Sequence, residues 1–305
     1  MSHTPRTTQA PRTANAQHRR AVAFRELHEN PRPFVVPNPW DAGSARLLAG
    51  LGFTALATTG AGLAHSSGRP DGTLTRADIL TNAREIVAAT DLPVTADLES
   101  GFGDKPEDVA ETVRLAAAAG LVGGSIEDST GRAEDPVRPL GEAVERVAAA
   151  VEAARGLDFP FTVTARAENF FVGRPDLDDT ILRLRAYEEA GADVLYAPAL
   201  PDAESVRAVC AAVSRPVNVL MGGALPLSVA DLGDLGVRRV STGSALSRAA
   251  LGALVRAARE IAEHGTFGFG ADALPYAEAN TLLAAPAPTA ASPNLADDRE
   301  SDLAP

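Results

Sequence analysis

Short apolar runs alternate with longer amphipathic segments along most of the chain. The runs are rich in Val, Ile, Thr and Ala, as in strands buried on both faces, whereas the longer segments repeat apolar residues at helical spacing. Eight strands are predicted in this way, at 34–37, 55–59, 94–99, 124–128, 162–168, 194–197, 217–221 and 239–241. The main helices expected between them are 76–89, 106–119, 141–155, 178–190 and 203–213.

Local signals support these helix boundaries. Thr75 precedes a predicted helix and Asp78 follows three residues later, which is a capping-box pattern. Several predicted helices end at glycine, the residue favoured at a left-handed C-cap, as at Gly120, Gly156 and Gly191. Two further helices are expected: 14–28 before the first strand, covering the barrel bottom, and 244–264 after the last. The second is longer than barrel closure requires, so we expect its excess to pack on another subunit.

Eight strand-then-helix units with short connections predict a (β/α)8 barrel of TIM type. The alternative is an open doubly wound sheet, but no GxGxxG follows the first strand. We assign residues 18–283 to a single barrel domain. Residues 1–17, rich in Thr, Pro and Arg, are expected to be a disordered tail, with a transit peptide as the alternative, and residues 284–305 a second disordered tail.

Composition narrows the function classes. The formal net charge of −12 argues against nucleic acid or an anionic membrane as partner. No run of about 18 apolar residues and no export signal occurs, so we expect neither a membrane span nor secretion but a cytoplasmic protein. The lone Cys210 excludes a disulfide framework and a thiolate metal site. The lone Lys105 begins a helix, which argues against a Schiff-base aldolase.

Carboxylates gather at the predicted strand ends, where a barrel of this type carries its chemistry. Asp97 and Glu99 end the third strand two residues apart, a spacing that places both on one face. Glu127 and Asp128 end the fourth on opposite faces, so we expect Asp128 to be an outward structural partner. Asp71 ends the Gly-rich loop after the second strand. Each acid alone has a plain alternative as a helix cap or solvated rim residue.

Carboxylates that converge on one mouth of low dielectric constant repel one another, and a hard divalent cation removes that conflict. Oxygen ligands completed by water suit Mg²⁺, or alternatively Mn²⁺. Zn²⁺ is not expected, because the five His residues show no ligand spacing. Arg166 and Glu168 share a face of the fifth strand, so Arg166 either serves the site or is a structural ion-pair partner of Glu168.

A series of motifs at barrel-unit spacing resembles the isocitrate lyase/phosphoenolpyruvate mutase superfamily over roughly residues 25–270. The motifs are "PNPWDAGSARLLAGLGFTALATTGAGLA", "GRPDG", "TADLESGFG", "GGSIEDS", "TARAENF", "AYEEAGADVLYAPAL" and "GVRRVSTG". The resemblance implies a Mg²⁺-dependent barrel that exchanges its eighth helix within a homo-oligomer, a tetramer or a dimer. It also implies cleavage or formation of C–C or P–C bonds beside a 2-oxo acid, through an enolate.

The resemblance also assigns roles to residues. Asp97 would bind the metal directly, with Glu99, Glu127 and Asp71 holding its waters. Thr59, Gly60 and Ala61 would bind the substrate carboxylate. Trp40 and Ser44 would line the same pocket, and Arg166 would clamp the oxyanion side of the substrate. A metal chelated by a 2-oxo acid stabilises the developing enolate, which agrees with these roles.

Two departures from the family pattern limit what carries over. Glu99 stands where the family usually has Asp. The segment expected to form the lid, 129–139, lacks both the Lys-Lys-Cys-Gly-His motif of the isocitrate and methylisocitrate lyases and the Lys- and Asn-containing loop of the mutases. Its remaining polar groups that could reach a substrate on closure are Ser129, Thr130, Arg132 and Arg138. Asn218 on the seventh strand either faces the pocket or is a satisfied core amide.

Four functional hypotheses follow. The first is a Mg²⁺-dependent lyase that cleaves a C–C bond of a small 2-oxo or 2-hydroxy di- or tricarboxylate, by retro-aldol reaction or decarboxylation. The second is a mutase or hydrolase of phosphonopyruvate type. The third is a non-catalytic barrel that binds a metal and an oxo acid. The fourth is a phosphate-binding barrel aldolase or isomerase, suggested by "MGG" and "STGSALS" after the last two strands.

Overall fold

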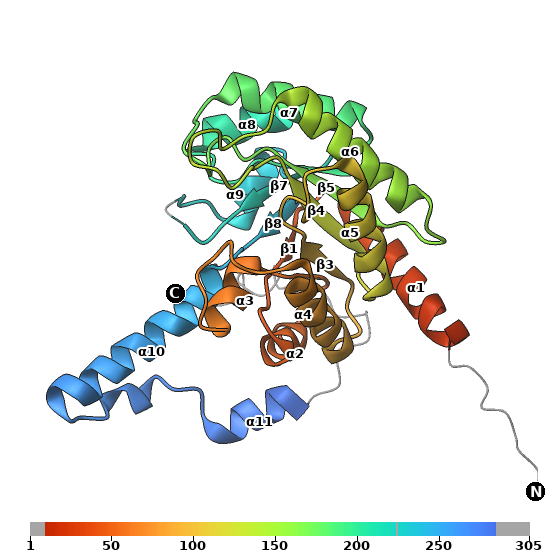
Figure 1. The fold of residues 1–305 in the computed structure, drawn as a ribbon. Coiled ribbons are helices and arrows are strands. Elements are labelled where there is room, and N and C mark those ends of the chain that lie inside the picture. The colour runs from red at the N-terminus through yellow and green to blue at the C-terminus, as the bar shows by residue number, and fades with distance from the viewer. Residues whose placement is uncertain (1–9, 224, 285–305) are drawn as a thin grey trace, which may run out of the picture.

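Eight parallel strands form the centre of the molecule in a computed structural model that describes residues 10–223 and 225–284 (Figure 1). The strands are β1 (Phe34–Val36), β2 (Leu56–Ala57), β3 (Val94–Asp97), β4 (Gly123–Glu127), β5 (Thr162–Arg166), β6 (Val194–Tyr196), β7 (Val217–Leu220) and β8 (Arg239–Ser241). Their order is β1-β8-β7-β6-β5-β4-β3-β2. The Ala57 N–H donates to the Pro37 carbonyl at 3.1 Å and joins the two ends of the sheet. The predicted (β/α)8 barrel is confirmed.

Helices follow the strands and surround the barrel. They are α2 (Ala42–Gly50), α3 (Gly60–Ser66), α4 (Arg76–Ala89), α5 (Pro106–Ala118), α6 (Leu140–Arg155), α7 (Leu177–Glu189), α8 (Ala203–Ala212), α9 (Val229–Asp234) and α10 (Ala245–His264). The capping box predicted from Thr75 and Asp78 begins α4, with the Asp78 N–H bound to Thr75 Oγ1 at 3.2 Å. Each predicted strand and helix is present with small shifts at its ends.

The core lies between the strands and their covering helices and is built largely from Ala, Val and Leu. Small side chains let α5 and α6 pack closely through residues such as Ala116 and Ala150, both fully buried. Burial of each larger apolar side chain stabilises the fold by about 1.5–3 kcal/mol. This shell fixes the strand ends, and the strand ends position the polar groups described below.

Helix α1 (Ala10–Glu29) covers the N-terminal end of the barrel. Phe24, fully buried, packs with Val36, Ala57 and Val122 in a small second core. The helix begins at Ala10. Residues 10–17, which we had expected to belong to a disordered tail, are therefore helical. Residues 1–9 and 285–305, the remainder of the two predicted tails, lie outside the described residues.

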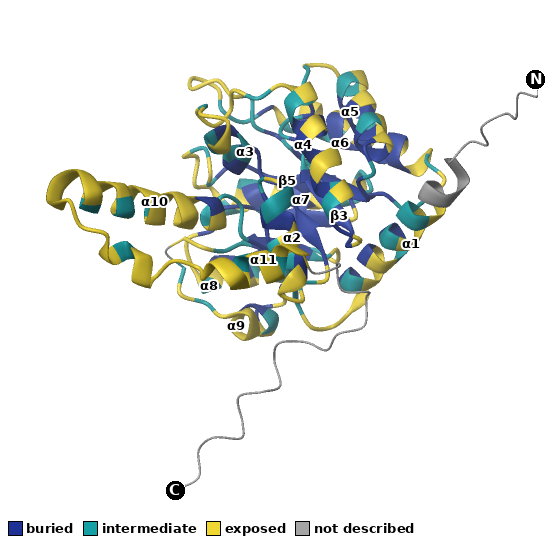
Figure 2. Cartoon of the chain, turned by 90° about the horizontal axis from the view of Figure 1, so that it is seen from below, coloured by how far each residue is buried: buried dark blue, intermediate teal, exposed yellow. Residues whose placement is uncertain are grey.

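The C-terminal arm leaves the barrel. Helix α10 projects into solvent along most of its length, followed by η1 (Gly268–Ala271) and α11 (Tyr276–Ala284), which returns to α2 (Figures 1 and 2). Ser247 is the one buried residue of α10, whereas Leu254, Val255 and Ile261 are exposed. The excess length predicted for this helix is therefore present, with its apolar face uncovered within the described part of one chain.

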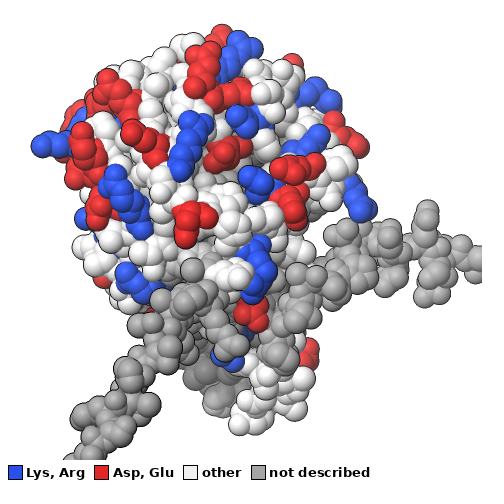
Figure 3. Space-filling model, turned by 90° about the vertical axis from the view of Figure 1, so that its right-hand side faces the viewer, with Lys and Arg blue, Asp and Glu red and all other residues white. Residues whose placement is uncertain are grey.

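Acidic and basic side chains are interspersed over the face shown in Figure 3, without a continuous basic patch on the part of it that is coloured. Within residues 10–223 and 225–284, no helix has the length and apolar character needed to cross a membrane.

Candidate active site

A cavity of about 170 Å³ opens at the C-terminal ends of the strands. Every strand contributes to it. Its lining includes Val36, Ala57, Thr95, Asp97, Ser125, Glu127, Arg166, Tyr196, Asn218, Leu220, Arg239 and Ser241 from the strands, with Asp71, Glu99 and Phe171 from the loops. The strand-end rule used on the sequence therefore located the cavity correctly.

Arg166, the last residue of β5, lies at the centre of the carboxylates. Its Nη1 is 2.9 Å from Asp97 Oδ1 and 3.2 Å from Glu127 Oε2, and its Nε donates to Glu168 Oε1 at 2.9 Å. Burial alone would lower the pKa of Arg166, but Glu168, Glu127 and Asp97 together raise it well above its usual value. Both readings of Arg166 hold: it faces the cavity, and it pairs with Glu168.

Glu99 reaches the cavity by a route that the sequence did not predict. Strand β3 ends at Asp97, Leu98 turns into the core, and Glu99 has a φ of 51°, in the left-handed region. We had expected Asp97 and Glu99 to lie together because they share one face of a strand. That reason is wrong, because Glu99 lies beyond the end of the strand. The turn itself brings Glu99 back, with its N–H bound to Asp97 Oδ1 at 3.2 Å. A Cβ on Gly60 would lie 2.3 Å from Glu99 Oε1, so only glycine leaves room for this carboxylate.

The carboxylates destabilise one another in the absence of a further cation. Burial, and then the neighbouring Asp97 and Glu127, raise the pKa of Glu99 to about 9. Burial also raises the pKa of Glu127, whose Oε1 accepts a hydrogen bond from Ser129 Oγ at 2.8 Å. One guanidinium does not neutralise the cluster, and a hard cation would favour the charged carboxylates.

The donor set bears on how a metal could be held. Asp71, Asp97, Glu99 and Glu127 all line the cavity and offer only oxygen, which suits Mg²⁺. Within residues 10–223 and 225–284, no three or more His, Cys, Asp or Glu side chains are grouped so that they could hold a metal directly. Oxygen donors of this kind suit an ion that keeps several waters, as Mg²⁺ commonly does.

The residues expected to bind substrate divide into two groups. Thr59, Ala61 and Asn218 line the cavity. Thr59 also caps α3, with its Oγ1 accepting from the Gly62 N–H at 3.2 Å. Asn218 is a cavity residue and a satisfied amide at once, because it donates to Ser241 Oγ and accepts from Arg239 Nε, each at 2.9 Å.

Trp40, Ser44 and Gly60 are not among the residues that line the cavity. The Ser44 hydroxyl donates to Asp41 Oδ1 at 2.7 Å and accepts from the Trp40 N–H at 3.1 Å, so it is engaged in the capping box of α2. Gly60 lies directly behind the Glu99 carboxylate. The geometry places Ser44 in a structural role and Gly60 in support of Glu99.

The predicted lid, 129–139, folds as a short hairpin-like loop. The Thr130 N–H donates to the Pro136 carbonyl at 2.9 Å, and the Arg138 N–H to the Asp128 carbonyl at 2.8 Å. Of the four polar candidates only Ser129 contacts a cavity residue, Glu127. Arg138 is buried against Glu142 at 2.6 Å, Arg132 pairs with Asp135 at 3.3 Å, and Thr130 bonds the Asp135 carbonyl.

Asp128 points away from the cavity, as predicted from its position opposite Glu127. Its Oδ2 accepts from Tyr187 Oη at 2.5 Å and from Arg183 Nη1 at 3.2 Å, and its Oδ1 from the Glu168 N–H at 2.8 Å. Burial raises the pKa of Glu168 to about 8. Asp128 therefore ties the end of the lid to the residue that pairs with Arg166.

Among the cavity residues that were not singled out from the sequence are Tyr196, Arg239 and Phe171. Tyr196 ends β6 beneath Arg166, with 5.1 Å between its ring centroid and Arg166 Cζ. The same strand-end rule that found Arg166 would have found it. Arg239 begins β8, where that rule does not look, and Phe171 lies on a loop without a sequence signal.

Comparison with known proteins agrees with the fold and identifies a family. A family model described as phosphoenolpyruvate phosphomutase matches residues 24–262. The chain is 34% identical over 264 residues to an uncharacterised Mycobacterium tuberculosis protein, covering 86% of this chain and 96% of the relative. It is also 34% identical to Escherichia coli 2-methylisocitrate lyase over 224 residues, covering 70% and 74% of the two chains.

Solved structures of related proteins share the fold. A Burkholderia cenocepacia protein of unconfirmed lyase or mutase activity superposes with a TM-score of 0.87 at 59% identity, over 89% of this chain and 98% of that one. A phosphonopyruvate hydrolase in complex with oxalate and Mg²⁺ gives 0.77 at 26% identity, over 86% and 94%. The expectation of a lyase of the isocitrate lyase/phosphoenolpyruvate mutase type is confirmed at the level of enzyme class. The chain belongs to the phosphoenolpyruvate phosphomutase family.

Proposed function

We propose that this protein is a Mg²⁺-dependent lyase that cleaves a C–C bond of a small 2-oxo or 2-hydroxy di- or tricarboxylate through an enolate. The observation that carries the proposal is the buried Arg166 held between Asp97, Glu127 and Glu168 in a small cavity lined by further carboxylates. A small cavity of this kind suits a compact acid. The similarity to a 2-methylisocitrate lyase supports cleavage of a C–C bond, and the similarity to a phosphonopyruvate hydrolase in complex with oxalate and Mg²⁺ supports a site for a metal and a small acid.

Some side chains would bind the metal and the substrate, and others would stabilise the negative charge that develops during the reaction. Asp97 would bind Mg²⁺ directly, with Glu99, Glu127 and Asp71 holding its waters, and the ion would supply Lewis-acid stabilisation of the substrate's oxygens. Arg166 is buried and fixed by Glu168, so its N–H groups would be aimed at the developing oxyanion without reorganisation. The backbone at Thr59 and Ala61, which line the cavity, would hold the substrate carboxylate.

Release of pyruvate, glyoxylate or CO₂ from a panel of 2-oxo and 2-hydroxy acids tests the proposal. We expect turnover of at least one acid, dependent on Mg²⁺, and loss of about 100-fold or more in D97A because the direct ligand is removed. D91A is the matched control, since Asp91 is exposed outside the site. Mg²⁺-dependent binding of oxalate without turnover of any acid would favour the non-catalytic barrel, and normal turnover by D97A would contradict the metal assignment.

Phosphorus–carbon chemistry is the second candidate, favoured by the family model that matches the chain. The absence of Lys and Asn from the lid, 129–139, counts against it. A ³¹P NMR time course with phosphonopyruvate and phosphoenolpyruvate separates the two. We expect no interconversion or phosphate release under conditions in which the C–C substrate is turned over.

A further inference from the structure

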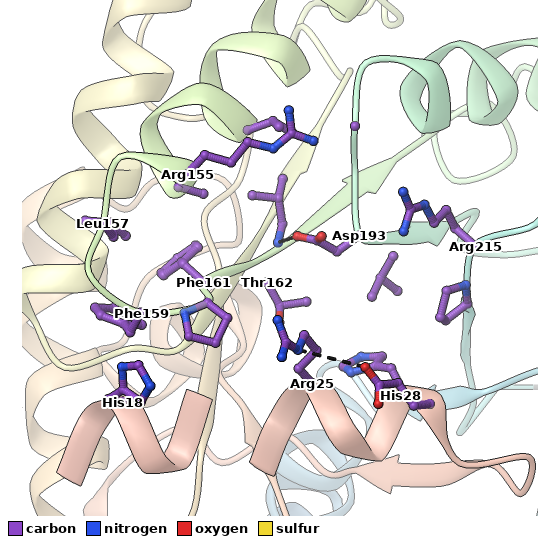
Figure 4. Close-up of a pocket in the computed structure, with 18 of the residues that line it drawn as sticks. His18, Arg25, His28, Arg155, Leu157, Phe159, Phe161, Thr162, Asp193 and Arg215 are labelled. Atoms are coloured by element: carbon purple, nitrogen blue, oxygen red, sulfur yellow. Dashed lines mark hydrogen bonds and ion pairs between the residues drawn. The ribbon is translucent and has the colours of Figure 1, made fainter. Parts of the chain in front are cut away.

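A second cavity, of about 580 Å³, lies at the opposite end of the barrel from the candidate active site (Figure 4). It is an open cavity bordered by α1, the end of α6 and the starts of β5, β6 and β7. The proposed reaction uses none of its residues.

Three arginines from different elements line this cavity: Arg25 on α1, Arg155 at the end of α6 and Arg215 before β7. Among the residues that the structure describes, neither Arg155 nor Arg215 makes a hydrogen bond or an ion pair. Arg25 has one distant partner, Glu29, at 3.9 Å. Two guanidinium groups therefore present their donors to the cavity without a protein acceptor.

Asp193, an acid of the lining, interacts with the arginines through its charge: burial raises the pKa of its carboxyl, and Arg215, Arg155 and Arg25 partly offset that rise. Asp193 lies between Arg155 and Arg215 in Figure 4, but its Oδ2 accepts from the Val163 N–H at 2.8 Å and so closes the start of β5. No salt bridge joins Asp193 to any arginine within the described ranges. Asp158 lies next to His18, whose Nδ1 is 3.2 Å from the Asp158 carbonyl oxygen.

The position of Arg155 depends on a glycine. Gly191, at the turn into β6, has a φ of 98°, and a Cβ there would lie 2.6 Å from Arg155 Nη2. The guanidinium thus lies against the backbone of this turn, although Arg155 as a whole is exposed.

The rest of the wall is apolar. Leu157 and Phe159 are half-buried along one side, and Phe161 is buried beneath them, as Figure 4 shows. A mostly apolar cavity with a few convergent polar groups is the usual form of a small-molecule site. Planar guanidinium forks recognise carboxylate and phosphate groups in particular.

We propose that this cavity binds a small organic anion, with its carboxylate or phosphate head group bound by the exposed donors of Arg155 and Arg215 and an apolar body against Leu157 and Phe159. The cavity is also joined to the active site. His28 lines it and accepts a hydrogen bond at Nε2 from Arg239 Nη1 at 3.4 Å, and Arg239 lines the catalytic cavity. The proposal concerns binding and does not depend on the reaction assigned above.

Calorimetric titration with phenyl phosphate, in the presence of a chelator that removes divalent cations, tests the proposal. We expect saturable 1:1 binding that weakens with added salt, and at least tenfold weaker binding in both R155Q and R215Q. Phenylacetate in place of phenyl phosphate distinguishes a carboxylate from a phosphate preference. Inorganic phosphate and benzyl alcohol, which carry the head group or the body alone, should each bind more weakly.

Two controls locate the binding. R207Q alters an exposed arginine of α8 outside the cavity and should bind like the wild type. R166Q disables the candidate active site and should also keep full binding. An F159W variant should change its fluorescence on titration, because the new indole lies against the ligand. Absence of saturable binding, full affinity in R155Q and R215Q, or loss of binding in R166Q would each overturn the proposal.

Discussion

At the scale of single residues, the site depends on close contacts between neighbouring groups. Gly60 shows this most clearly, because its missing side chain is the space that the Glu99 carboxylate occupies. Glu99 is one methylene longer than the Asp usual in the family, and its left-handed backbone returns that longer side chain to the cluster. The departure noted in the sequence is therefore accommodated by the turn after β3 together with this glycine.

The variant G60A tests that relationship. Its Cβ would displace Glu99, which we propose to hold a water of the metal, so we expect Mg²⁺ affinity to fall by about 10- to 100-fold. The free energy of unfolding should change by less than about 1 kcal/mol, since Glu99 is flexible and Ala is favoured over Gly in a helix. Calorimetric Mg²⁺ titration and chemical denaturation measure the two quantities.

G141A is the matched control, because a Cβ on Gly141 meets no atom within 4 Å. It should leave Mg²⁺ affinity unchanged. If G60A bound Mg²⁺ as tightly as the wild type, Glu99 would have no part in holding the metal.

At the scale of elements, α1 closes the barrel through an imidazole that must stay neutral. His28 Nδ1 donates to the Phe24 carbonyl at 2.8 Å, and its Nε2 faces Arg239. Burial, and then the charge of Arg239, lower the pKa of His28 from 6.5 to about 3. The unfolded chain therefore binds this proton at a higher pH than the folded one.

Because the pKa of His28 is lower in the folded protein, the direction of the pH effect on stability follows. Stability due to neutral His28 is full above pH 6.5 and is lost as the pH falls toward about 3. We expect a loss of about 1.4 kcal/mol per pH unit in this window. In H28Q the amide can still donate to Phe24 and accept from Arg239 but cannot titrate, so its unfolding free energy should depend less on pH between about 7 and 5. Urea denaturation at several pH values measures the difference, and parallel curves for the two proteins would refute it.

The elements themselves were predictable, whereas the details of the site were only partly so. Apolar period and cap signals identified every strand of the barrel, because burial on both faces leaves a strong imprint on the sequence. Because the strand ends were predicted, the polar residues at those ends could be named as candidates, and Asp97, Glu127 and Arg166 do line the cavity. The rotation of Ser44 into the cap of α2, the left-handed Glu99 and the inward Arg239 were not, since they depend on turn geometry and on partners distant in the sequence.

At the scale of the whole molecule, the candidate site and the projecting arm are adjacent. Ser244 lines the catalytic cavity, and α10 begins at the next residue. The exposed apolar side chains of the arm are too many for a surface in water. We therefore propose that α10 packs on a second copy of the chain, as the family resemblance implies, and that this contact also steadies the cavity rim.

Replacement of Leu254 by Glu tests this assembly. Leu254 is 63% exposed within one chain, so a charge there should not affect folding of the barrel, but it would be buried and unpaired in an interface. We expect the wild type to be a dimer or tetramer of 31.5 kDa chains and L254E to shift toward the monomer by light scattering after size exclusion. L182E, at a position 54% exposed on α7, should remain assembled. Activity should fall in L254E and recover at high protein concentration, because mass action restores the contact beside Ser244. A monomeric wild type, or an L254E variant that assembles normally, would show that α10 does not form the interface.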